Sequence, residues 1–184
     1  LDTHSSATRQ LGSSAIVVGS LLDPDTNVVS YGGWRQIRGK LYSKSWEKIT
    51  PDMKCWVQCD TINGNCVLIP QAVVQQIGNL DPVFRHSMGD MDYGFRVRKN
   101  GFQIVVAPGY CGTCRSNDGA GLWTDGSLPL VSRWRKLLGP KGLPVREWRV
   151  FAYRYKGPLW MLFWLSPYIK FWVEAFTSAS RTAR

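Results

Sequence analysis

The segment RHSMGDMDYGFR, residues 85–96, concentrates negative charge in a chain that is otherwise rich in basic residues. Asp90 and Asp92 precede a basic run that ends at Lys99, an order of charges that complements a helix dipole. Apolar and polar residues also alternate here, which is typical of a strand. The charge gradient and the Asn-Gly stop signal at residues 100–101 favour a helix. The two carboxylates either serve only the start of that helix or form part of a polar site.

Apolar runs on both sides of this segment predict an α/β layered domain. Residues 15–20 and 66–69 are short apolar runs of the kind found in buried strands, and residues 102–107 predict a further strand closed by Pro-Gly. Between them, Pro70 opens a predicted helix that ends at Gly78. Strands that alternate with helices in this way are typical of α/β folds.

Other stretches lack a clear period and are predicted to be turns or loops. Residues 23–27 form a predicted turn. Residues 34–54 are polar, basic and aromatic, and we expect a long loop that crosses the mouth of a site. Residues 111–119 are also predicted to be loop, and residues 139–144 a hinge or surface loop.

Composition limits the classes of protein and partner. The 184 residues are 44% hydrophobic and 20% charged, which fits a globular domain of ordinary size. A net charge of +10 favours anionic partners such as nucleic acid, an acidic membrane face or phosphorylated molecules. Five cysteines without a secretory signal predict free thiols in a reducing, cytoplasmic compartment. The first residue is not methionine, so we expect a fragment or a processed product.

The last forty residues are unusually rich in aromatic side chains. The run 159–176 contains Pro167, Lys170 and Glu174, and it is shorter than the ~20 mostly apolar residues that a spanning helix requires. Tryptophan and tyrosine favour the headgroup layer, and basic residues favour anionic lipid, so one interpretation is a helix lying peripherally on a membrane. The other is an aromatic-rich helical subdomain packed on the core. The expected division is a catalytic portion over residues 1–120 and a helical tail over residues 121–184.

Several short motifs along the chain occur in the order found in one enzyme family. They are VVGS at 17–20, YGG at 31–33, DTINGNCVLIP at 60–70, IGNLD at 77–81 and GDMDYGFR at 89–96. This series resembles the acceptor-side half of family 2 glycosyltransferases, with the closest likeness to the bacterial rhamnosyltransferase-like branch. The likeness spans residues 15–110, and GPKGLP at 139–144 is similar to the tail of that branch.

Membership would imply a GT-A fold, a Rossmann-like α/β sandwich, and transfer of a sugar with inversion from a nucleotide-sugar donor to a glycan or lipid-linked acceptor. Asp90 matches the position of the family's catalytic aspartate. A carboxylate within hydrogen-bond reach of a sugar hydroxyl can take its proton as the new C–O bond forms. Gly89, which is also expected to line the substrate site, precedes it where many relatives carry glutamate.

The resemblance also implies roles for the residues around Asp90. Asn63, Gly64 and Asn65 match the strand end beside the donor sugar, where glycine allows close backbone approach. We assign Asp92 and Arg96 to the same substrate site, where they would orient the helix and the acceptor loop as support and not as part of the chemistry. His86 either faces the site or serves as a surface or packing residue.

Two parts of the family's pattern are missing upstream of Asp60. The chain has no strand leading into a nucleotide-binding loop and no Asp-x-Asp motif after such a strand, since DPD at 23–25 falls in a turn. We therefore expect the second half of an enzyme that is inactive alone. The divalent ion, Mg²⁺ or Mn²⁺, is expected to be held mainly by the missing N-terminal half, and no metal ligand is assigned in this chain.

Two alternatives follow from the residues themselves. Cys55 and Cys59 with Cys111 and Cys114 have the internal spacings of a four-thiolate zinc site. The charge and the tryptophans instead allow a non-enzymatic basic module that binds membrane or nucleic acid. No helix-turn-helix, RNA-binding strand or zinc-finger pattern occurs, so a nucleic-acid partner is not expected.

Overall fold

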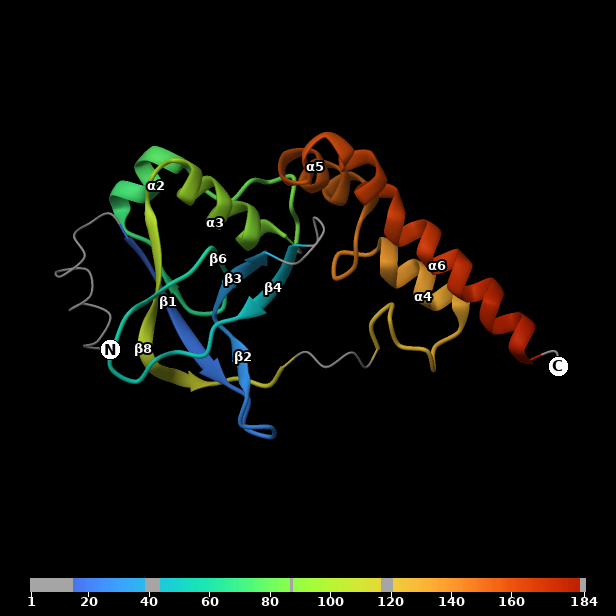
Figure 1. The fold of residues 1–184 in the computed structure, drawn as a ribbon, viewed down its shortest axis with the longest axis horizontal. Helices are drawn as coiled ribbons and strands as arrows, with labels where there is room; N and C mark the ends of the chain where they lie inside the picture. The colour runs from blue at the N-terminus through green and yellow to red at the C-terminus, as the bar shows by residue number, and fades with distance from the viewer. Residues whose placement is uncertain (1–14, 39–43, 87, 117–120, 183–184) are drawn as a thin grey trace. The chain divides into compact units, whose positions relative to one another are not determined.

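The computed structural model describes residues 15–38, 44–86, 88–116 and 121–182 and divides the chain into two compact units (Figure 1). The first unit comprises Leu1–Asp81 and Gly89–Asn117, and the second comprises Pro82–Met88 and Asp118–Arg184. The chain therefore passes through the second unit twice, since the short segment before the acidic stretch belongs to it.

The first unit is built around strand β1, Ala15–Leu22. This strand pairs in parallel with β8, Gln103–Thr113, and antiparallel with β2, Val29–Tyr31, and β7, Val67–Leu68. Strand β5, Val57–Gln58, pairs antiparallel with the other side of β8. The first six residues of β1 are buried, which confirms the prediction of a strand covered on both faces.

Helices cover one face of this sheet (Figure 1). They are α2, Gln71–Ile77, and α3, Gly89–Lys99. Val73 of α2 and Tyr93 and Val97 of α3 pack with Ile16 and Ile104 of the two central strands. The mixture of strands and helices confirms the α/β class, and α3 confirms the helix predicted over the acidic stretch. Gly78 and Gly101, which follow the two helices, have φ angles of 79° and 85°, values that favour glycine.

A second sheet corrects part of the long loop expected over residues 34–54, because residues 34–38 and 44–48 are strands. Residues 49–54 have no regular secondary structure, and residues 39–43 lie outside the described residues. Strand β3, Gly33–Arg38, pairs antiparallel with β4, Lys44–Lys48, and with β6, Thr61–Ile62. Trp34, Gln36, Trp46 and Lys48 form the half-buried face of the hairpin. Half-buried and exposed side chains alternate over residues 34–37 and 46–48. Because two of the four half-buried side chains are polar, this alternation does not appear as hydrophobic periodicity in the sequence. The Lys48 side chain is held on that face by two hydrogen bonds. Its Nζ donates to the carbonyl oxygens of residues 29 and 30, at 3.0 and 2.6 Å.

Two other strand predictions need correction. The predicted buried strand at 66–69 is only the two-residue β7, and Leu68 is 42% exposed. Strand β8 does not close at Pro108-Gly109 but continues to Thr113, so residues 111–113 of the predicted loop are strand. Residues 117–119 of that loop lie outside the described residues. Its pairing with β1 continues to the end of both strands because register shifts opposite residues 18–21 accommodate the Pro-Gly step.

The second unit is helical. It contains α4, Leu130–Leu138, α5, Val145–Tyr155, a short 3-10 turn η1, Gly157–Leu159, and α6, Trp160–Thr182. Trp134 of α4 packs against Tyr168, Phe171 and Trp172 of α6, with ring centroids 5.2 to 6.2 Å apart. The connection between α4 and α5 is the loop predicted at residues 139–144. Within the described ranges, none of the helices has the length and apolar character that crossing a membrane requires.

Helix α3 lies unusually close to β6, and Gly94 is the reason. A Cβ atom at Gly94 would stand 2.9 Å from Thr61 Cα, which real contacts do not tolerate. The Thr61 hydroxyl donates to the carbonyl oxygen of Met91, at 3.0 Å, and is fully buried. The position of the N-terminal turn of α3 therefore depends on this contact.

We expect Gly94→Ala to destabilise the protein, although alanine is otherwise favoured over glycine in a helix by about 1 kcal/mol. Overpacking against the Thr61 backbone should lower the free energy of unfolding by about 1–3 kcal/mol. Urea denaturation measures the change. The control is Gly112→Ala in β8, where the new Cβ would lie 3.8 Å from Leu21 and should change stability by less than about 0.5 kcal/mol. A stabilised Gly94→Ala protein would contradict the packing argument.

Candidate functional site

The candidate site is centred on a contact between two motifs that are 26 residues apart in the sequence. Asp90 lies in the first turn of α3 and is half-exposed. The Gly64 N–H donates to Asp90 Oδ2 at 3.1 Å, and Gly64 lies in the exposed turn between β6 and β7. The structure thus brings the Asn-Gly-Asn turn and the acidic helix start together, as a common site requires.

The Asp90 carboxylate is held by backbone groups. Its Oδ1 accepts a hydrogen bond from the Met91 N–H at 2.9 Å, while Oδ2 accepts the one from Gly64. Each carboxylate oxygen can accept a further hydrogen bond. Among the described residues, no basic side chain forms an ion pair with Asp90. A half-exposed carboxylate in this arrangement can accept a hydrogen bond, and then a proton, from a hydroxyl group outside the chain.

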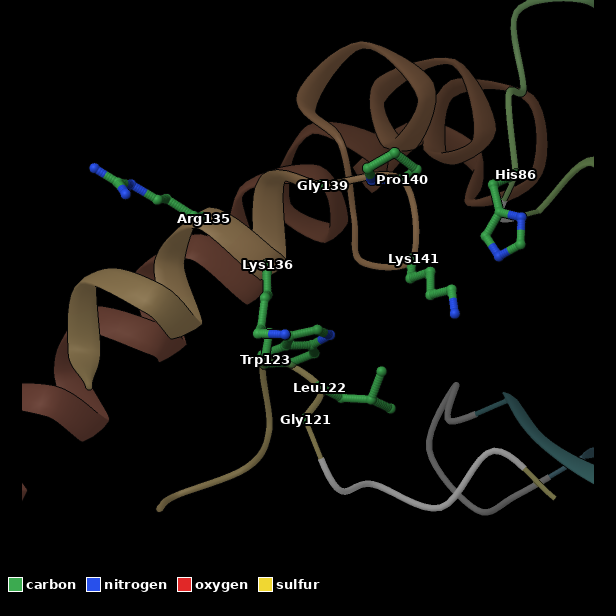
Figure 2. A pocket seen from close by; sticks show the side chains of 9 residues that line it. All are labelled: His86, Gly121, Leu122, Trp123, Arg135, Lys136, Gly139, Pro140 and Lys141. Atoms are coloured by element: carbon green, nitrogen blue, oxygen red, sulfur yellow. The ribbon is translucent and has the colours of Figure 1, made fainter. Parts of the chain in front are cut away.

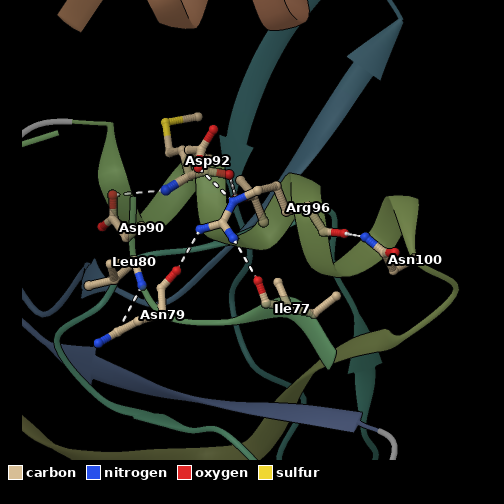
Figure 3. Close-up of polar contacts among 9 residues, drawn as sticks. Ile77, Asn79, Leu80, Asp90, Asp92, Arg96 and Asn100 are labelled. Carbon is tan, nitrogen blue, oxygen red and sulfur yellow. Dashed lines mark hydrogen bonds and ion pairs between the residues drawn. The ribbon is translucent and has the colours of Figure 1, made fainter. Parts of the chain in front are cut away.

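Asp92 and Arg96, which follow Asp90 on the same helix, form an internal ion pair (Figure 3). Asp92 is fully buried, and Arg96 Nε donates to its Oδ2 at 2.8 Å. The two Nη groups of Arg96 donate to the carbonyl oxygens of Ile77 and Asn79, at 3.1 and 3.0 Å. The pair therefore ties α3 to the residues that end α2. This placement fits the orienting role inferred for both residues and leaves Asp92 no exposed surface for a substrate.

The remaining positions of the turn and of the helix start differ in exposure. Asn63 is half-buried, and its N–H donates to the carbonyl oxygen of Gly32 at 3.1 Å. Within the described part of the chain, its buried Oδ1 has no hydrogen-bond partner. Asn65 is exposed, whereas Gly89 is buried as the first residue of α3. Met88 precedes it with a φ of 68°, an uncommon conformation for a non-glycine residue.

His86 belongs to the second compact unit, where it lines a pocket with residues of α4 and the following loop (Figure 2). Sequence reasoning did not find this pocket. The pocket's other basic residues are Arg135, Lys136 and Lys141. In the sequence, the only sign of the pocket is that these cations lie within or just before the predicted loop at residues 139–144. Their convergence with His86 depends on the fold.

The four-cysteine zinc site was a wrong alternative. All five cysteines are described, and nowhere in the described ranges do three or more His, Cys, Asp or Glu side chains gather as metal ligands. Cys59 is in the core, where burial raises the pKa of its thiol to about 12. Cys111 lies near Cys66 and not near Cys59. Both sulfur atoms are close to Gly19, since each would be 2.7 Å from a Cβ atom added to that residue.

Replacing Arg96 by methionine tests whether the internal ion pair supports the site. This change leaves the buried Asp92 without its cation, which should lower the free energy of unfolding by about 3–5 kcal/mol. The matched control is Lys99→Met, which removes the same charge from an exposed position on the same helix. It should change stability by less than about 0.5 kcal/mol. Equal stabilities of the two variants in urea denaturation would show that the pair does not hold α3.

Comparison with known proteins does not assign this chain to a family. No family model matches the sequence. No curated protein matches it either.

Proposed function

We propose that this chain forms the acceptor side of an inverting glycosyltransferase, with Asp90 as the catalytic base. The observation that carries the proposal is the hydrogen bond from Gly64 to the half-exposed Asp90 carboxylate. It joins the two motifs on which the resemblance to family 2 glycosyltransferases is most specific. The proposed GT-A fold is consistent with the α/β architecture of the first unit, whose remaining nucleotide-binding part would come from additional polypeptide.

The proposed reaction exchanges one C–O bond at the anomeric carbon for another and transfers one proton. A hydroxyl oxygen of the acceptor attacks the anomeric carbon of the donor sugar from the face opposite the nucleotide. The new C–O bond forms as the bond to the nucleotide diphosphate breaks, and the hydroxyl proton passes to Asp90. The Gly64 N–H holds the carboxylate, and the Asp92–Arg96 pair keeps the helix in position. Holding both substrates in line supplies much of the remaining reduction of the barrier.

The proposed donor would bring a diphosphate whose charge a divalent ion, Mg²⁺ or Mn²⁺, would offset. The described residues do not fit that ion, because they gather no three potential ligands. We propose that the nucleotide-binding half would carry it. The acceptor would be a glycan or a lipid-linked sugar at the cytoplasmic face of a membrane.

Asp90→Asn, made in the complete enzyme, tests the proposed base. The amide keeps the size of the side chain but cannot take the hydroxyl proton, so the rate of transfer should fall by about 10²–10⁴-fold. Donor binding should remain within about twofold, since binding does not require proton transfer. Transfer is measured with labelled nucleotide-sugar, and donor binding by calorimetry.

The control is Asp25→Asn, which removes a carboxylate from an exposed ion pair with Arg115 in the turn after β1. This variant should retain full activity. Turnover by Asp90→Asn equal to that of the control would place the base elsewhere and would remove the main support for the proposal.

The exposed face of α6 supports a second proposal, that the chain lies on an anionic membrane surface. Phe163 is exposed elsewhere on this helix, and the other exposed large apolar side chains form one stripe: Met161, Leu162, Leu165, Ile169, Trp172, Val173 and Phe176. At 3.6 residues per turn they fall within an arc of roughly 120°. Phe171, on the opposite side, is buried against Trp134 of α4, which runs alongside α6 in Figure 1.

We expect this stripe to prefer lipid to water. Transfer of each large aliphatic or aromatic side chain from water into an apolar environment contributes about 1.5–3 kcal/mol to the free energy of binding. The net charge of +10 adds attraction to anionic headgroups. Membrane attachment would bring the acceptor side of a transferase to a lipid-linked substrate. It is equally the main property of the alternative function, a non-enzymatic basic membrane-binding module, which would need no catalytic Asp90.

The double variant Leu162→Glu/Ile169→Glu tests the α6 stripe. Two charges on the apolar arc should reduce co-sedimentation with anionic lipid vesicles at least about tenfold, since the transfer of two large apolar groups is lost. The control, Val28→Glu/Met53→Glu, adds the same charge at exposed apolar positions of the first unit. If the α6 variant and the control sediment alike, the stripe does not contact lipid.

A further inference from the structure

The second unit contains a cavity of about 590 Å³ that the proposed chemistry at Asp90 does not use (Figure 2). This volume suits a small organic molecule. One part of its lining is basic, with His86, Arg135, Lys136 and Lys141. Leu122, Trp123 and Pro140 provide an apolar part. An amphiphilic anion is the kind of ligand that matches both.

The segments that line the pocket are held together by specific contacts. Arg133 Nε donates to the carbonyl oxygen of Trp123 at 3.0 Å, which fixes the segment before α4 to that helix. The Leu143 N–H donates to the carbonyl oxygen of Leu137 at 2.6 Å, which folds the following loop back on α4. The hydroxyl of Tyr168 donates to the carbonyl oxygen of Leu143 at 2.7 Å, so α6 supports the same loop.

His86 reaches the pocket through a buried anchor. Its neighbour Arg85 donates to Glu147 of α5 from both the backbone N–H and Nε, at 3.3 and 3.2 Å. The Glu147 side chain is 2% exposed, whereas that of Arg85 is 78% exposed, so the backbone hydrogen bond to the buried carboxylate fixes this segment more than the ion pair does. Cations near the end of α4 also complement its dipole, but that explanation does not extend to His86 or to Lys141, which lie outside the helix.

The pocket carries positive charge without a carboxylate among its lining residues. Within the described ranges, Arg135 and Lys141 have no ion pair. Lys136 acts electrostatically on Asp125, but the Asp125 oxygens already accept hydrogen bonds from Gly121 and Ser127. Figure 2 shows the Lys136 side chain next to Trp123 and the Lys141 side chain extending toward His86, whereas Arg135 points away from them.

We propose that this pocket binds an organic diphosphate, with its phosphates against Lys136, Lys141 and His86 and its apolar part against Leu122 and Trp123. Lysine ammonium groups bind phosphate as point charges, and an aromatic wall accepts an apolar group without requiring hydrogen bonds. The apolar wall favours a lipid diphosphate over a nucleotide. Identification of this ligand with the lipid-linked acceptor rests on the proposed glycosyltransferase function, whereas binding itself does not.

The experiment measures binding of a short-chain isoprenyl diphosphate to the 184-residue chain by equilibrium dialysis. The variant Lys136→Gln/Lys141→Gln removes two exposed charges from the pocket and should weaken binding at least about tenfold. The control, Lys99→Gln/Lys170→Gln, removes the same charge from exposed positions outside it and should bind within about twofold of the parent chain. Inorganic diphosphate and a nucleoside diphosphate are measured in parallel, and both should bind at least about tenfold more weakly than the isoprenyl ester.

Three outcomes would overturn the proposal. Equal binding by the pocket variant and the control would place the ligand elsewhere. Equal affinity for inorganic diphosphate would reduce the pocket to a bare anion site. Tighter binding of the nucleoside diphosphate would exclude the lipid ligand. Loss of transfer in Asp90→Asn concerns the proposed function alone, so binding here can succeed or fail independently of it.

Discussion

The first unit depends on how closely α3 approaches β6. Gly94 removes the side chain that would otherwise separate them, and Thr61 uses the space to donate to the helix backbone. At the other end of the helix, Arg98 forms an ion pair with Asp60, which also accepts a hydrogen bond from the backbone of β3. Two connections along one helix restrict both its distance from the sheet and its rotation. The position of Asp90 is a consequence of this restriction.

The buried Asp92–Arg96 pair adds a different constraint. A buried carboxylate contributes to stability only while its partner remains, and here the partner also donates to two carbonyl oxygens, one in the last residue of α2 and one just after it. The two carboxylates of the acidic segment therefore have different roles. Asp92 is used inside the protein, whereas Asp90 keeps part of its surface and its hydrogen-bonding capacity toward solvent. That division supports a chemical role for Asp90.

The second unit is organised by the two faces of α6. The inner face packs its aromatic rings on Trp134, and through Tyr168 it supports the loop that carries Lys141. The outer face remains apolar and exposed. Because one helix supports a basic pocket on one side and an apolar stripe on the other, membrane attachment and binding of a phosphorylated lipid are compatible properties of this unit.

The sequence by itself determined the α/β class, the buried strand β1, helix α2 with its stop at Gly78 and the helix at the acidic segment. Each depends on a local pattern: a continuous apolar run, a proline and glycine at helix ends, or a charge gradient along a dipole. Only the tertiary structure decided that residues 33–48 include a hairpin, since its inner face carries polar side chains whose partners lie elsewhere. The contact between Gly64 and Asp90 and the convergence of His86 with Lys141 were likewise decided by folding, because residues far apart in the chain meet only when packing brings their backbones together.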